Sequence, residues 1–231
     1  MVYWLTLLSD GGDFFNLFRY ITFRAGGAFL TSLLFGFVFG KPLINLLRRR
    51  QGRGQPIRSD GPEGHQSKAG TPTMGGALIL GALVVSTLLW ARLDNMHIWV
   101  VLFVTIGFGA IGFADDYAKV SKQTSAGVPG RVRLGLGFAI ALIAALVAAQ
   151  LHPEGLRLQV AVPVLKDALV PFGIVFFPFA MIVIVGTANA VNLTDGLDGL
   201  AVMPVMIAAA ALGVLAYAVG RVDFTQYLDV H

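Results

Sequence analysis

The chain has 231 residues, of which 56% are hydrophobic and only 13% charged, and its mean hydropathy is +0.74. Soluble domains carry about 25% charged residues, so this composition excludes an ordinary soluble domain and indicates an integral membrane protein. The formal net charge is +4, and the sequence has no cysteine, which excludes disulfides, thiolate chemistry and cysteine-ligated zinc.

Six apolar stretches approach the length of about 20 residues that a spanning helix needs. We therefore expect an all-α, polytopic transmembrane bundle of six spans, forming a single domain over residues 1–231. Pro171 and Pro178 are expected to bend the fifth span, and residues 156–164 alternate as in a small hairpin. The stretches are Ala25 to Leu47, Met74 to Ala91, His97 to Ala114, Leu134 to Leu151, Ala168 to Ala188 and Leu200 to Gly220.

The positions of lysine and arginine in the short loops predict the orientation of the spans. The loop after the second span offers only Arg92, whereas the loops after the first and third spans are strongly basic. We therefore place the loops at about 48–73, 115–133 and 189–199 in the cytoplasm, and both ends of this chain outside. The basic residues of the first and third loops are Arg48, Arg49, Arg50, Arg53, Arg58, Lys68, Lys119, Lys122, Arg131 and Arg133.

Two adjacent carboxylates, Asp115 and Asp116, follow the third apolar run in "IGFADDYAKV", residues 111–120. We expect them at the cytoplasmic C-terminus of that span, where the helix dipole and their mutual repulsion both oppose two negative charges. Lys119 would compensate one turn later. A Mg²⁺ ion would do so more completely, since it favours one or two carboxylates plus phosphate oxygens. The alternative is a solvated helix end, and from this pair alone the two interpretations are evenly balanced.

A ladder of two amides and two carboxylates is predicted after the fifth span. Its members recur at intervals of three residues, so on a helix they would share one broad side, drifting about 60° per step. Gly196 and Gly199 would permit close approach of a ligand. Helix capping is the alternative, with Asp198 capping the sixth span, but it does not account for four residues. The members are Asn189, Asn192, Asp195 and Asp198.

The first cytoplasmic loop, "QPIRSDGPEGHQSKAGTPTMGG" at residues 55–76, leads into the second span. Lys68 and the unpaired N–H groups at the start of that helix would form an anion site. We therefore predict substrate contacts for Lys68 and Thr73. The arginines of residues 48–53 need only to hold the loop inside or to contact anionic lipid.

Three segments, "IRSDGPEGHQSKAGTPTMGG", "GFADDYAKV" and "NAVNLTDGLDGLA", together resemble the bacterial phospho-N-acetylmuramoyl-pentapeptide-transferase family over about residues 41–205. The resemblance implies transfer of phospho-MurNAc-pentapeptide from UDP to undecaprenyl phosphate, giving lipid I and UMP, with Mg²⁺ as the cofactor. It also implies a bacterial cytoplasmic membrane protein with a cytoplasmic active face. Its partners would be UDP-MurNAc-pentapeptide, undecaprenyl phosphate and membrane lipid, with no nucleic acid; a homodimer is left open.

The resemblance also implies roles at matching positions. Asp115 would deprotonate the lipid phosphate, or act covalently, and Asp116 would organise Mg²⁺ or the diphosphate. Substrate-binding roles fall to Lys68 at the nucleotide, to Gly196, Leu197 and Asp198 in the uridine pocket, to Thr73, Asn192 and Asp195 along the sugar diphosphate, and to Asn189 behind them.

Family members continue through further spans, with another metal-binding aspartate and a histidine-rich loop. We therefore expect the resemblance to cover only the N-terminal portion of such an enzyme, and this chain to be inactive alone. Three alternatives stay open: a GlcNAc-1-phosphate transferase acting on the same lipid, a membrane transporter, and a non-catalytic assembly role. A transporter needs carboxylates near the bilayer midplane, whereas these are predicted at the ends of spans.

Overall fold

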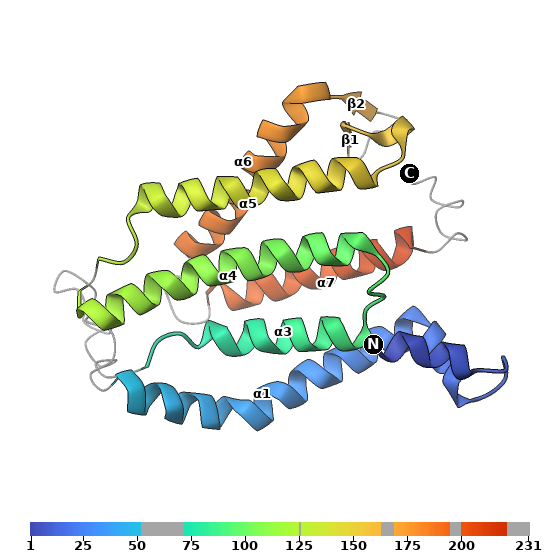
Figure 1. Ribbon diagram of the computed structural model, residues 1–231, viewed down its shortest axis with the longest axis horizontal. Coiled ribbons are helices and arrows are strands. Elements are labelled where there is room, and N and C mark those ends of the chain that lie inside the picture. Colours follow the sequence, from blue (N-terminus) through green and yellow to red (C-terminus); the bar gives the residue numbers. More distant parts are fainter. Residues whose placement is uncertain (52–71, 125, 163–168, 195–199, 221–231) are drawn as a thin grey trace. The chain divides into compact units, whose positions relative to one another are not determined.

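The structure is a computed structural model that describes residues 1–51, 72–124, 126–162, 169–194 and 200–220 (Figure 1). It divides into two units, Met1–Leu151 and His152–His231, which are described separately. The first unit contains η1 Val2–Leu8, η2 Phe14–Arg19, α1 Ile21–Gln51, α3 Gly76–Trp90, α4 Met96–Lys122 and α5 Gly130–Leu151. The second contains η3 Glu154–Leu156, β1 Gln159–Ala161, β2 Leu169–Pro171, η4 Gly173–Val175, α6 Phe176–Thr194 and α7 Val202–Val219.

In the part of the chain that the structure describes, five helices are long and apolar enough to cross a membrane: α1, α4, α5, α6 together with η4, and α7. This confirms the predicted all-α, polytopic membrane protein. The remaining predicted span, α3, is apolar but has only 15 residues, or roughly 22 Å of helix against about 30 Å of hydrocarbon. The count of six spans and the outside placement of both ends stay predictions.

The end of α4 differs from the prediction, because the helix continues past Ala114 to Lys122. Lys119 and Lys122 stand in its last turn, where positive charge complements the negative end of the helix dipole. Gln123 then adopts a left-handed conformation and ends the helix. Asp115 and Asp116 therefore lie inside α4 and not at its terminus.

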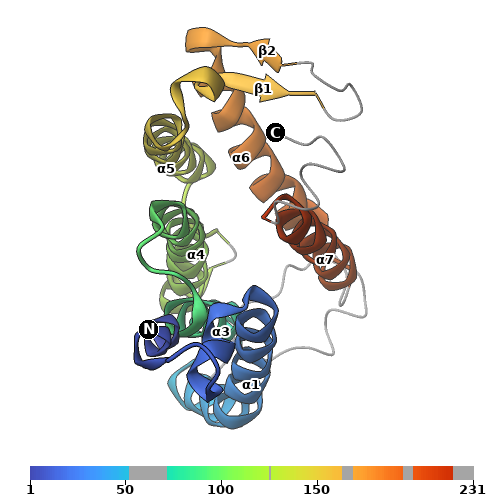
Figure 2. The same ribbon diagram turned by 90° about the vertical axis from the view of Figure 1, so that its right-hand side faces the viewer.

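The start of the fifth span also differs. Leu169–Pro171 form strand β2, which pairs antiparallel with β1 (Figure 2). The segment 156–164 predicted as a hairpin contains only β1, and the second strand lies later in the chain. Pro171 is therefore part of a strand and does not bend a helix. Pro178 lies in the first turn of α6, where its missing N–H leaves no helical bond unmade.

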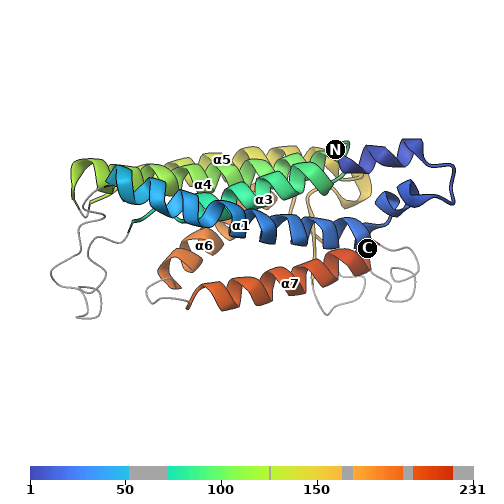
Figure 3. The ribbon, with the colours of Figure 1, turned by 90° about the horizontal axis from the view of Figure 1, so that it is seen from below.

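In the first unit the described helices α1, α3, α4 and α5 lie in chain order, and each packs on the next with alternating direction (Figures 1 and 3). Glycines permit the close approach. A Cβ at Gly107 of α4 would lie 2.8 Å from a methyl carbon of Ile140 on α5. A Cβ at Gly109 would lie 2.6 Å from a methyl carbon of Leu80 on α3. Small residues at helix interfaces are the common solution in membranes, where packing must supply the attraction.

Trp90, the last residue of α3, joins this helix to the N-terminal part of α1. Its indole Nε1 donates to Oγ1 of Thr31 at 2.8 Å, and its ring lies over Gly27. Phe18 and Phe23 surround the same ring, with centroids 6.2 Å and 6.1 Å away. A rigid aromatic ring therefore fills the space that Gly27 leaves open.

We predict that Gly27→Ala destabilises the α1–α3 pair by about 1–3 kcal/mol, the usual cost of overpacking. The added Cβ would lie 2.5–2.6 Å from the nearest three ring carbons of Trp90. Thermal unfolding of the detergent-solubilised protein measures the effect. Gly26→Ala is the matched control, because nothing lies within 4 Å of its Cβ position. Equal melting temperatures for the two variants would contradict the packing described.

Candidate functional site

Lys119 lies between the two adjacent carboxylates of α4. Its Nζ is 2.7 Å from Oδ2 of Asp115 and 3.6 Å from Oδ1 of Asp116. The spacings of four and three residues place all three side chains on one face of the helix, where opposite charges attract. The structure thus realises the predicted compensation by Lys119, and one cation serves two anions.

Asp115 is nearly enclosed, with only 8% of its surface exposed. Its Oδ2 faces Lys119, while its Oδ1 accepts a hydrogen bond from the backbone N–H of Val128 at 2.8 Å. A Cβ built on Gly127 would clash with the same carboxylate, lying 2.7 Å from its Cγ and 2.9 Å from Cε of Lys119. The segment leading into α5 therefore folds directly over Asp115, and only a glycine fits at residue 127.

Asp116 is the more accessible carboxylate, with 31% of its side chain exposed. Its Oδ2 accepts a hydrogen bond from the hydroxyl of Thr73 at 3.0 Å. Thr73 precedes α3, so this bond links the segment before α3 to α4. Thr73 and Asp116 are both predicted site residues, and the structure brings their side chains together.

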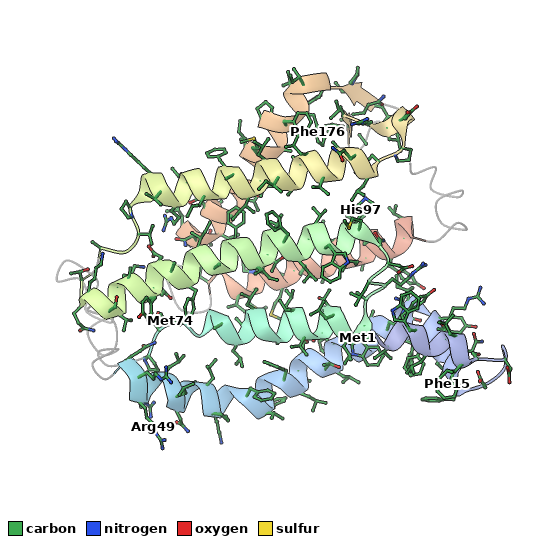
Figure 4. All side chains as sticks on the ribbon, in the orientation of Figure 1. Met1, Phe15, Arg49, Met74, His97 and Phe176 are labelled. Atoms are coloured by element: carbon green, nitrogen blue, oxygen red, sulfur yellow. The ribbon has the colours of Figure 1, made fainter. Side chains whose placement is uncertain are left out.

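Gln51, the last residue of α1, holds the backbone of Thr73. Its side-chain Nε2 donates to the carbonyl of Thr73 at 3.0 Å, and the Thr73 N–H donates to its Oε1 at 2.9 Å. Met74 follows with φ of 73°, a left-handed conformation that costs a non-glycine residue roughly 1–2 kcal/mol. In Figure 4, Arg49 and Met74 lie at one end of the first unit's helices, and Met1 and His97 lie at the other.

Asn189 and Asn192 of the predicted ladder both lie in α6. The side-chain Nδ2 of Asn189 donates to the carbonyl of Val185 at 2.7 Å, so part of this amide is used within its own helix. Asn192 is exposed. The lesser role expected for Asn189 agrees with this bond, while a binding role for either residue stays a prediction.

The remaining ladder members, Asp195 and Asp198, lie outside the described residues, and so do Gly196, Leu197 and Lys68. The N-cap of α7 is Ala201, which makes no side-chain capping bond, and the alternative that Asp198 caps this helix falls on a residue outside the described ones. At the start of α3 the N-cap is Gly75, also without a side-chain bond. The predicted anion site with Lys68 therefore stays a prediction.

Two contributors to the site were missed from the sequence. Gln51 reads as the end of an arginine-rich run, and nothing in its neighbourhood indicates a bond to a residue 22 positions later. Gly127 reads as an ordinary loop glycine in "SAGVPG". Pro129 and Gly130 shortly after it are typical of a turn, but they do not indicate that the turn lies against Asp115.

Among the described residues, no three histidine, cysteine, aspartate or glutamate side chains lie close enough together to hold a metal. A Mg²⁺ ion, however, commonly takes one or two carboxylates and completes its shell with water and phosphate oxygens. The half-exposed Asp116 suits that role. Asp115 does not in the arrangement described, because it is nearly enclosed and its Oδ2 forms a close ion pair with Lys119.

The sequence matches a known family over more than half of its length. Residues 98–228 match glycosyl transferase family 4, and residues 68–80 match signature 1 of the phospho-N-acetylmuramoyl-pentapeptide-transferases. The chain therefore belongs to glycosyl transferase family 4. The first match contains the paired carboxylates and α6, and the second contains Thr73 and the start of α3.

Curated relatives narrow this assignment to the phospho-N-acetylmuramoyl-pentapeptide-transferases. The proteins of that name from a Ruegeria species and from Ruegeria pomeroyi are 72% and 71% identical to this chain over all of its 231 residues. The one from Maricaulis maris is 60% identical over 97% of the chain. The family resemblance predicted from three motifs is confirmed. The chain spans 64% of the length of the two Ruegeria relatives.

We predict that Gly127→Ala displaces the segment before α5 from Asp115. The methyl group would clash with the carboxylate, so the hydrogen bond from the Val128 N–H would be lost. Hydrogen–deuterium exchange should then be about tenfold faster at the Val128 amide, as expected for a lost hydrogen bond of ordinary strength. Gly130→Ala is the control, since nothing lies within 4 Å of its Cβ position. Unchanged exchange in the Gly127 variant would refute this contact.

Proposed function

We propose that this chain contributes part of the catalytic site of a Mg²⁺-dependent transferase in the first membrane step of peptidoglycan synthesis. The enzyme would move phospho-MurNAc-pentapeptide from UDP to undecaprenyl phosphate, giving lipid I and UMP. One observation carries the proposal: Asp115, Lys119 and Asp116 form an ionic cluster of two carboxylates around one lysine, on a helix apolar enough to cross a membrane. The names of the relatives support the same activity.

The chemistry suits such a cluster. Both proposed substrates are anionic, and the acceptor is anchored in lipid by its prenyl chain. Phosphoryl transfer depends on positioning and on neutralising charge more than on covalent chemistry by the protein. A site near the polar end of a spanning helix lets the acceptor phosphate reach carboxylate and lysine while its prenyl chain stays in the bilayer.

Asp115 is the proposed base, and Lys119 controls its availability. With Lys119 Nζ at 2.7 Å, Oδ2 of Asp115 is occupied. An incoming diphosphate offers Lys119 a further anion, and movement of the Lys119 ammonium toward it would free Oδ2 of Asp115 to take the proton of the lipid phosphate. The acceptor oxygen then bonds to the phosphorus that carries the sugar. The bond from that phosphorus to the bridging oxygen breaks, and the oxygen leaves with UMP.

Asp116 is the proposed magnesium ligand, and the Thr73 hydroxyl orients it. When bound, the ion would neutralise charge on the diphosphate. Lys68 would contact the nucleotide, with Gly196, Leu197 and Asp198 around the uridine. Thr73, Asn192 and Asp195 would face the sugar diphosphate, with Asn189 behind them.

The proposed location is the bacterial inner membrane, with the site on its cytoplasmic face. The basic residues at the ends of α1 and α4 support this orientation, because positive charge accumulates in cytoplasmic loops. Access from the cytoplasm is also what a soluble nucleotide substrate requires. A homodimer stays a prediction that the arrangement of a single chain does not test.

We predict that Asp115→Asn lowers lipid I formation by at least about 100-fold, the lower range for loss of a general base. The variant is made in the full-length form, meaning this chain extended to the length of its relatives. Membranes receive undecaprenyl phosphate and UDP-MurNAc-pentapeptide, and both lipid I and UMP are measured. The amount of inserted protein should stay unchanged.

Asp94→Asn is the control at an exposed aspartate. Arg92 hydrogen-bonds Asp94 at 2.6 Å and lowers its pKa, yet both side chains are well exposed. This control should keep full activity. Retained activity in Asp115→Asn would remove the proposed base. Use of UDP-GlcNAc in place of the muramoyl donor would favour the related transferase, and transport of substrate without UMP release would favour a transporter.

A further inference from the structure

Gln51 is a buried polar side chain at an unexpected place. It ends α1 directly after three exposed arginines, Arg48 to Arg50, yet only 9% of its own surface is exposed. Buried amides require hydrogen-bond partners, and both ends of this amide have one. Both partners are backbone groups of the same residue, Thr73.

Such a paired bond fixes orientation as well as distance. The Gln51 amide donates to the Thr73 carbonyl at 3.0 Å and accepts from the Thr73 N–H at 2.9 Å. Two bonds in parallel restrict rotation of the backbone on both sides of the Thr73 Cα, as in a strand pair. The direction of the Thr73 side chain is thereby limited.

The hydroxyl of Thr73 makes a hydrogen bond to a carboxylate of the candidate site. It donates to Oδ2 of Asp116 at 3.0 Å, while Oδ1 of Asp116 lies 3.6 Å from Lys119 Nζ. The next residue, Met74, is buried in a left-handed conformation, so the backbone here is strained. Strained backbone persists where the surroundings fix it, and the Gln51 amide supplies two such constraints beside it.

We propose that Gln51 is a positioning residue, which acts through the Thr73 backbone to aim the Thr73 hydroxyl at Asp116. The inference rests on the proposed function, because it gives Gln51 a role at the same site. Gln51 itself does not touch substrate. The alternative is that the amide only ties the end of α1 to the start of α3, which would affect stability without acting through the Thr73 hydroxyl.

A double-mutant cycle separates these two roles. Gln51→Met keeps the length of the side chain and removes both hydrogen bonds. Thr73→Val keeps the shape of residue 73 and removes only the hydroxyl. In the full-length form we expect Gln51→Met to lower kcat for lipid I formation by roughly 10-fold to 100-fold. In the Thr73→Val background, the same change should alter kcat by less than about threefold.

Equal fold-losses in both backgrounds would overturn the proposal, and so would full activity in Gln51→Met. Arg49→Met is the control, since Arg49 is exposed two residues earlier and should keep wild-type kcat. If Gln51→Met does not accumulate in the membrane, Gln51→Glu takes its place in the same cycle. It keeps the acceptor for the Thr73 N–H and sets an oxygen against the Thr73 carbonyl.

Asp116→Asn distinguishes failure of this inference from failure of the proposed function. If Asp116→Asn retains activity, the site itself is wrongly assigned. If Asp116→Asn is inactive while the cycle shows independent losses, only the role of Gln51 is rejected.

Discussion

The ion pair between Lys119 and Asp115 is the interaction on which the rest of the candidate site depends. An almost buried carboxylate on an apolar helix requires a partner, because the cost of removing a lone charge from water is high. Lys119 is that partner, with its Nζ 2.7 Å from Oδ2 of Asp115, and the Val128 N–H donates a hydrogen bond to Oδ1 at 2.8 Å. Two consequences follow: α4 must continue for at least one turn beyond Asp115, and the segment before α5 must return over the carboxylate.

The neighbouring carboxylate is held differently, and this difference divides the proposed roles. Asp116 is half-exposed, and it accepts a hydrogen bond from the hydroxyl of Thr73. The backbone of Thr73 is held in turn by the side chain of Gln51 on α1. Asp115 is enclosed, and its availability depends on where Lys119 lies. One lysine therefore links the two carboxylates, so a single anionic ligand that attracts Lys119 would change the surroundings of both.

Much of the fold could be predicted from the sequence. The thickness of the bilayer sets the length of the apolar runs, and positive charge accumulates in cytoplasmic loops. The helix ends could not. Residues Asp115 to Lys122 are polar enough to read as a loop, but ion pairs at spacings of three and four keep them helical. Thr73 and Asp116 were both predicted as site residues because each falls in a recognisable motif, but the hydrogen bond between them was not predicted. Gln51 and Gly127 were missed because their partners are distant in sequence or are backbone groups.

A shared catalytic site requires that the paired carboxylates of α4 and the amides of α6 face the same side of the membrane. Cysteine labelling tests it directly, since this chain has no cysteine of its own. Single substitutions Lys122→Cys, Thr194→Cys and Asp94→Cys would be exposed to an impermeant maleimide in intact cells, with the unsubstituted protein as the background. We predict that only the residue 94 variant is labelled in intact cells, and that the other two are labelled once the membrane is opened. Labelling of residues 122 and 194 from opposite sides would contradict a shared site.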